Sequence, residues 1–254
     1  MNKVNYKDFY DRVGVLNGWD FSSVKCVSEQ APWDFYREVT KRCQSSDLLL
    51  DIGTGGGEAI LSIAESASLL VGIDQSTGMM ETANRNLSSS GRANVRFLEM
   101  NGDQLEFPAH FFNVISCRHS PFSAKEVARV LSRGGIFLTQ QVAEHDKLNL
   151  KEAFGRGQAL GTPGDTLKQQ YLTKLSEAEF TDVQSFEYNI NEYYQTAEDL
   201  IFLLKHTPII PGFGQNEGDF QTLQRFIAEN QREQGILTNS ARFMIIARRI
   251  SAIN

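Results

Sequence analysis

The chain of 254 residues is 41% hydrophobic and 22% charged, which is typical of globular enzymes and unlike disordered or membrane-spanning proteins. Its 25 Lys and Arg residues against 31 Asp and Glu residues give a net charge of -6, which disfavours a surface devoted to binding polyanions. Three scattered cysteines fit neither a disulfide framework nor a Cys-x-x-Cys zinc site, and the polar start lacks the apolar stretch of a signal peptide. We therefore expect a soluble cytoplasmic protein without a membrane span, built as one domain with an insertion.

From residue 48 onward, short apolar runs alternate with segments of helical periodicity, a pattern typical of β-α units around a mostly parallel sheet. Strands are predicted at residues 48–50, 69–73, 95–97, 112–117 and 136–139. Ser76 is a candidate cap for the helix after the second strand, and Ser123 with Glu126 has the capping-box spacing for a helix before the fifth. After Glu144 the weaker pattern predicts helices at 167–180, 197–205 and 220–234, and strands at 183–193 and 242–247. The last strand is expected to be antiparallel, at the sheet edge or inserted within the sheet.

A glycine loop follows the first predicted strand, where a ligand can approach the backbone and the start of a helix. Its glycines are Gly53, Gly55 and Gly57, and the third glycine of a dinucleotide-binding pattern would fall on Glu58. Glu58 at that position disfavours NAD binding. A Walker phosphate loop is excluded because no Gly-Lys-Ser/Thr sequence follows.

Two carboxylates accompany this loop. Asp51 precedes the glycines and Asp74 ends the second predicted strand, near the point where an open sheet binds ligands. A carboxylate there can accept hydrogen bonds from ribose hydroxyls or orient an ammonium group. The pattern favours a cationic nucleoside without phosphates.

Together these motifs resemble those of class I S-adenosylmethionine-dependent methyltransferases. The resemblance implies that the glycine loop holds the methionine part of S-adenosylmethionine, that Asp74 holds the ribose, and that S-adenosylhomocysteine is the product. Met79 and the Gly102-Asp103 pair would lie near the adenine. The cofactor residues implied in this way are Asp51, Gly53, Thr54, Gly55, Gly57, Asp74, Gln75, Met79, Gly102, Asp103, Cys117 and Arg118.

Segments outside these motifs also resemble a bacterial group of methyltransferases (methyltransferase type 11/25-like) whose substrates are mostly unassigned. Some members of that group are named after ribosomal RNA guanine methyltransferases, whose N-terminal cysteine-rich zinc module has no counterpart here. The fold implied is α/β and Rossmann-like, a mostly parallel seven-stranded sheet with helices on both faces. Residues 1–45 would form N-terminal helices or a lid, 46–145 the cofactor-binding core, and 194–238 a lid insertion before the last strand.

The acceptor side of the site is less clearly marked. His119 follows the fourth strand, where the transferred methyl should point, and is the candidate general base, although a lone histidine is more often packed or at the surface. Tyr10, Trp19, His206 and Phe213 are candidates for a lid over the acceptor, with core packing as the equal alternative for the aromatic residues.

A small-molecule methyl acceptor is the leading expectation. A ribosomal or transfer RNA methyltransferase and a non-catalytic S-adenosylmethionine-binding protein are the alternatives. No metal site is expected, and the oligomeric state is left open.

Overall fold

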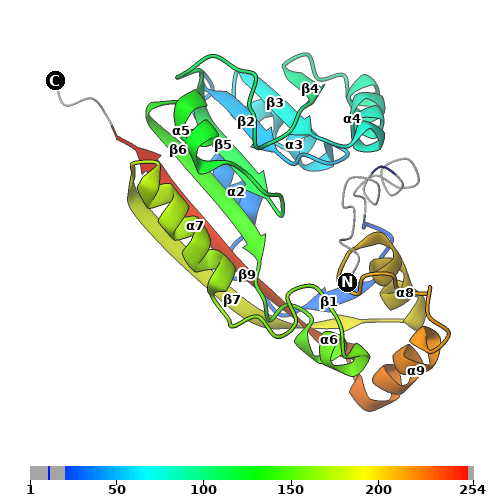
Figure 1. The fold of residues 1–254 in the computed structure, drawn as a ribbon. Coiled ribbons are helices and arrows are strands. Elements are labelled where there is room, and N and C mark those ends of the chain that lie inside the picture. Colours follow the sequence, from blue (N-terminus) through cyan, green and yellow to red (C-terminus); the bar gives the residue numbers. More distant parts are fainter. Residues whose placement is uncertain (1–10, 12–20, 251–254) are drawn as a thin grey trace.

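A computed structural model describes residue 11 and residues 21–250 of the chain. Nine strands form one sheet, in the order β1-β7-β9-β6-β5-β2-β3-β4, with β8 paired to β9 beside this path (Figure 1). The strands are β1 (Cys26–Ser28), β2 (Leu48–Ile52), β3 (Leu69–Asp74), β4 (Val95–Glu99), β5 (Phe112–Arg118), β6 (Leu131–Val142), β7 (Phe180–Tyr194), β8 (Gln231–Arg232) and β9 (Gly235–Arg249). Strands β2 to β6 are parallel to one another, whereas β9 runs antiparallel to both β6 and β7.

The helices lie mostly between consecutive strands and cover the sheet from both sides (Figure 1). Those described are α2 (Phe35–Thr40), α3 (Glu58–Ser62), η1 (Ala64–Ser66), α4 (Thr77–Ser90), α5 (Ala124–Val130), α6 (Leu148–Phe154), α7 (Thr166–Glu177), α8 (Ala197–His206) and α9 (Asp219–Asn230). Both predicted N-caps are confirmed, because the Ser76 side chain accepts from the Met79 N–H and the Ser123 side chain accepts from the Glu126 N–H. The reciprocal half of the capping box is not formed, since the Glu126 carboxylate accepts from the Leu105 N–H and from Arg129 instead. The parallel strands β2 to β6, with helices on both faces of the sheet, confirm the predicted α/β Rossmann-like fold.

The predicted number of seven strands is wrong. The two additional strands, β1 and β8, have three and two residues, which is too short to produce an alternating pattern. Strand β1 also places part of the segment expected to be N-terminal helices in the sheet, where it pairs with β7. Of the two placements expected for the last strand, insertion within the sheet is the one observed.

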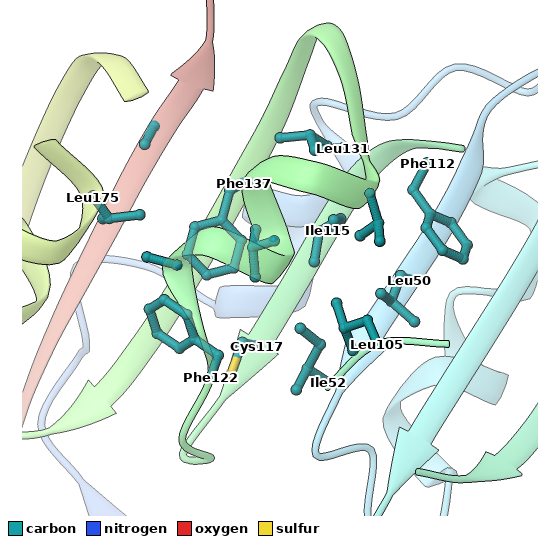
Figure 2. Packing of buried hydrophobic residues seen from close by; sticks show 14 of the residues in the cluster. Leu50, Ile52, Leu105, Phe112, Ile115, Cys117, Phe122, Leu131, Phe137 and Leu175 are labelled. Carbon is teal, nitrogen blue, oxygen red and sulfur yellow. The ribbon is translucent and has the colours of Figure 1, made fainter. Parts of the chain in front are cut away.

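Strand β2 shows why the first apolar run is continuous. Its residues Leu49 and Leu50 are both fully buried, but they belong to hydrophobic clusters on opposite faces of the sheet. Figure 2 shows the cluster around Leu50, in which Phe122 and Phe137 pack at a ring-centroid distance of 4.8 Å. The core thus fixes β2 on both sides and holds the loop that follows it.

A third hydrophobic cluster lies apart from these two, where α6, α8 and α9 gather around one end of β7 and β9 (Figure 1). The buried Leu200 and Leu204 of α8 and Phe226 of α9 contribute to it. Helices α8 and α9 lie within residues 194–238, whereas α6 comes earlier in the chain, and the domain boundaries given above remain predictions.

Candidate cofactor and acceptor site

Two carboxylates, one buried and one half-buried, lie at the carboxyl ends of adjacent parallel strands. Asp51 of β2 is fully buried, and its carboxylate accepts hydrogen bonds from Ser116 Oγ at 2.6 Å and from Tyr36 Oη at 3.4 Å. Burial raises the pKa of Asp51 to about 6, although the hydrogen bond from Ser116 opposes the shift. A carboxylate held in this way gains most from a ligand that brings a positive charge.

The glycine loop that follows β2 requires its glycines for two reasons. Gly53, Gly55 and Gly57 all have positive φ angles, of 76°, 57° and 79°. A Cβ on Gly53 would lie 2.2 Å from the Cβ of Ser120, and a Cβ on Gly57 would lie 2.3 Å from the ring of Phe97. The loop is therefore packed tightly against the segment after β5 on one side and against β4 on the other.

Four backbone N–H groups of this loop donate hydrogen bonds to acceptors within the protein. Those of Gly53 and Thr54 donate to the Ile73 carbonyl at 2.8 and 3.0 Å, and that of Gly57 donates to the Thr54 carbonyl at 3.1 Å. That of Gly55 donates to Asp74 Oδ2 at 3.1 Å. A phosphate-binding loop points such donors at its ligand, so this loop fits a ligand without phosphates.

Asp74 connects the loop to the next helix. Its Oδ1 accepts from the Ser76 N–H at 3.0 Å, and burial raises its pKa. The Ser76 hydroxyl in turn donates to Asp11 Oδ1 at 2.7 Å, so the N-terminal part of the chain reaches this end of β3. Tyr10 and Trp19, predicted to belong to a lid, lie outside the described residues.

The other predicted cofactor residues surround the same strand ends. Met79 is buried at the start of α4, Gln75 is half-buried beside Asp74, and Asp103 is exposed in the turn after β4. A Cβ on Gly102 would lie 2.8 Å from Ile52 Cγ2, so this turn packs directly on β2. Their contacts with a cofactor remain predictions.

Cys117 and Arg118 end strand β5 and face different surroundings. The Cys117 thiol is fully buried, donates to the Ser120 carbonyl at 3.1 Å, and has its pKa raised by burial. The Arg118 side chain is exposed, with its guanidinium carbon 5.7 Å from the centre of the Tyr36 ring. The contacts of Cys117 and Arg118 with a cofactor remain predictions.

His119 is held as a neutral ring. The Trp33 indole N–H donates to Gln140 Oε1 at 2.8 Å, which directs the Gln140 amide nitrogen to His119 Nε2 at 3.2 Å. His119 Nε2 therefore accepts a hydrogen bond, and the ring proton resides on Nδ1. Burial, followed by the charges of Arg242 and Arg118, lowers the pKa of His119 well below its usual value. A general-base role for His119 stays a prediction that this geometry does not favour.

A pocket of about 280 Å³ opens beside His119. Its wall comes from the end of β6, the loop after it, the start of α6, residues 158–170 and Ile209. Three buried charged residues in this wall, Glu144, Asp146 and Lys151, were not predicted as site residues. Glu144 and Asp146 could have been noticed in the sequence because they belong to a cluster of charged residues that follows the carboxyl end of a strand.

The loop at residues 206–213 reaches this pocket through Ile209 rather than through the two residues predicted for a lid. The His206 ring stacks on Phe202 with a centroid distance of 4.0 Å, and its Nδ1 lies 2.8 Å from the Phe202 carbonyl oxygen. Phe213 is buried in the third hydrophobic cluster, against Phe154. The alternative of core packing is the one observed for Phe213, because its neighbours are other apolar side chains.

The comparison with known families agrees with this geometry. Residues 49–135, from strand β2 to the start of β6, match a family described as "Methyltransferase domain". This part of the chain is therefore similar to methyltransferase domains. No three His, Cys, Asp or Glu side chains of the described residues gather as a metal-binding group, and no helix in that part of the chain could cross a membrane.

Two curated methyltransferases are similar to this chain over part of their length. The uncharacterized methyltransferase YcgJ of Bacillus subtilis is 33% identical over 106 residues, which are 39% of this chain and 42% of YcgJ. The demethylmenaquinone methyltransferase of Lactococcus lactis is 26% identical over 168 residues, or 61% of this chain and 66% of that enzyme. The matches thus span less than two thirds of either relative.

Solved structures show the same fold over most of the chain. The YcgJ structure has a TM-score of 0.58 with 21% identity, covering 85% of this chain and 98% of YcgJ. The [4+2]-cyclase SpnF has a TM-score of 0.61 with 18% identity, covering 97% of this chain and 96% of SpnF. A phosphoethanolamine N-methyltransferase of Haemonchus contortus, solved with S-adenosylhomocysteine, has a TM-score of 0.54 with 18% identity, covering 85% of this chain and 51% of that protein. At these identities the likeness concerns the fold alone, and the methyltransferase domain shares that fold with a cyclase.

Proposed function

We propose that the protein is an S-adenosylmethionine-dependent methyltransferase that acts on a small-molecule acceptor. Bound S-adenosylmethionine would supply an activated methyl group. Asp51 would hold its ammonium group, and Asp74 would accept hydrogen bonds from its ribose hydroxyls, for which each carboxylate oxygen keeps a free lone pair. The inward-turned N–H groups of the glycine loop and the buried Thr54 Oγ1, which has no partner among the described residues, suit a cationic ligand without phosphates.

The observation that carries the small-molecule proposal is the position of the pocket. The segment after β5 separates it from the glycine loop: Ser120 packs against Gly53, while the adjacent His119 lines the pocket. The Ser120 carbonyl also accepts from Gln141 Nε2 at 2.8 Å, and Gln141 is a further lining residue. The pocket and the glycine loop therefore contact the same short segment. Transfer would require the acceptor to extend past this segment into direct contact with the methyl group, with water excluded.

The pocket suits a small acceptor better than RNA. At about 280 Å³ it is close to the lower end of small-molecule pockets, which measure roughly 300–1,000 Å³. The buried carboxylate of Glu144 in its wall would repel a phosphate backbone. RNA recognition would instead require a basic surface beside the transfer site.

The proposal is tested by incubating the protein with S-adenosylmethionine carrying a labelled methyl group and a bacterial extract divided into small molecules and RNA. We expect label in the small-molecule fraction only, and much less of it with the Asp74→Ala variant. Label confined to RNA would overturn the proposed acceptor class. Normal S-adenosylhomocysteine binding by calorimetry without transfer to either fraction would instead indicate a protein that uses the fold without methylating, as the cyclase likeness allows.

A further inference from the structure

Glu144, one of the residues that line the pocket, has a buried acceptor atom without a hydrogen-bond partner among the described residues. Glu144 is 6% exposed, and its Oε1 accepts from the Leu167 N–H at the start of α7 at 2.6 Å. Its Oε2 is buried without a hydrogen-bond partner among the described residues. A buried carboxylate oxygen in this state is destabilising unless something binds it.

The two neighbouring charged residues in the pocket wall have hydrogen-bond partners, and the charge of Lys151 also interacts with Asp146 and Glu144. Asp146 is paired with Arg242 and also accepts from the Ala241 N–H. Lys151 donates from Nζ to the backbone carbonyls of Glu144 and Gln158, at 2.6 and 3.0 Å. Among the described residues, no cation lies within ion-pair distance of the Glu144 carboxylate.

We propose that Glu144 is a specificity residue of this pocket and that it binds a protonated amine on the methyl acceptor. A protonated amine suits Glu144 Oε2, since it donates the missing hydrogen bond and places a positive charge directly on that oxygen. A hydroxyl would supply only the hydrogen bond, and a carboxylate would be repelled. The anchoring of Oε1 by the α7 backbone fixes the Glu144 side chain in advance, so little side-chain freedom is lost on binding.

This assignment rests on the proposed function, because the amine-bearing molecule is taken to be the acceptor of the methyl group. Glu144 follows β6 by two residues and lies in the same pocket wall as His119. An amine bound at Glu144 would therefore hold the rest of the molecule toward the segment that faces the glycine loop. Glu144 recognises the acceptor, whereas Asp51 and Asp74 belong to the cofactor.

The test compares three probes that share a skeleton and differ in one end group: 3-phenylpropylamine, 3-phenylpropan-1-ol and 3-phenylpropanoate. Their binding to the full chain, saturated with S-adenosylhomocysteine at pH 7.5, is measured by titration monitored by NMR. We expect the amine to bind at least about tenfold more tightly than the alcohol, the usual gain of a charge-assisted over a neutral hydrogen bond. The carboxylate should bind most weakly.

Glu144→Gln keeps the shape and the oxygen that accepts from Leu167, but removes the charge. In this variant the preference for the amine should fall to about twofold or less. The matched control is Glu152→Gln, which removes the same charge from an exposed position on α6 and should leave the preference intact. Equal binding of all three probes, no binding of any, tightest binding of the carboxylate, or an amine preference that persists in Glu144→Gln would each overturn the proposal.

Two further measurements separate the possible failures. A purely structural Glu144 predicts that Glu144→Gln lowers the unfolding midpoint, whereas a binding residue predicts an unchanged or higher midpoint, so a fall of more than about 4 °C contradicts the assignment. S-adenosylhomocysteine binding by calorimetry reports on the proposed function alone. Its absence in the unaltered protein would refute the cofactor assignment, whereas normal binding without a charge preference would refute only the role of Glu144.

Discussion

Replacing Asp51 by Asn should stabilise the free protein near neutral pH, because Asp51 keeps a negative charge where water cannot reach it. Burial raises the pKa of Asp51 to about 6 from an ordinary value of 3.8. Each pKa unit corresponds to about 1.4 kcal/mol, so a shift of about two units amounts to about 3 kcal/mol. Asn retains an oxygen that can accept from Ser116 Oγ and carries no charge.

The sign of the pH dependence follows from the raised pKa. Between about pH 4 and pH 6 the native protein holds a proton on Asp51 that the unfolded chain has already released. The stability that this proton provides is fully present below about pH 4 and is lost as the pH rises through about 6. Asp51→Asn should therefore have little effect at pH 4 and should increase the free energy of unfolding by up to about 3 kcal/mol at pH 7.

Urea unfolding of the ligand-free protein, followed by tryptophan fluorescence at several values between pH 4 and pH 7, measures this difference. Glu106→Gln removes a charge from an exposed side chain and provides the control, with an expected change within about 0.5 kcal/mol at every pH. A variant that is less stable than the unaltered protein at pH 7, or a difference independent of pH, would refute the reasoning. The same substitution should weaken S-adenosylmethionine binding, which would explain why a destabilising carboxylate is kept.

Asp74→Ala should weaken S-adenosylhomocysteine binding by about 1–3 kcal/mol, because ribose hydroxyls lose a charged acceptor, and calorimetry on a variant with a normal circular dichroism spectrum checks this. Gly53→Ala should destabilise the fold by at least about 1–2 kcal/mol in urea unfolding, since its φ is 76° and its Cβ would meet Ser120; Ser120→Gly should restore part of the loss. Phe213→Ala should lower stability by about 3–5 kcal/mol, as for other buried aromatic side chains, and a small loss would return Phe213 to the lid hypothesis. The Cys117 thiol, buried and with a raised pKa, should resist alkylation until the protein unfolds, which mass spectrometry can follow.

The parts of the fold that the sequence predicts are those in which neighbouring residues carry the whole signal. The run at residues 48–50 is apolar without interruption because both faces of β2 are covered, and the glycine spacing reflects φ angles within one loop. Strand β9 extends from Gly235 to Arg249, but only its apolar second half was predicted. Its first half has two apolar residues followed by three polar ones, which is neither a continuous apolar run nor an alternation, so the sequence does not mark its start.

The pocket beside His119 could not be predicted because its wall comes from segments far apart in the sequence. Lys151 and Ile209 are 58 positions apart and meet only after α6 and α8 pack on the same end of the sheet. A buried Lys151 has the same appearance in the sequence as an exposed helix lysine, since its partners are backbone carbonyls. Likewise Glu144 becomes distinctive only once Oε1 is bound by α7 and Oε2 is left without a partner.

The position of β9 also constrains how the protein is made. It is the last strand along the chain, yet it lies between β6 and β7. Until residues 235–249 have left the ribosome, β6 has an open edge and β7 can pair only with the three residues of β1. Open edges of this kind readily pair with other chains, so a nascent or truncated form ending before β9 is exposed to aggregation. The same strand brings Arg242 to Asp146, and the pocket beside His119 is therefore completed in the step that closes the sheet.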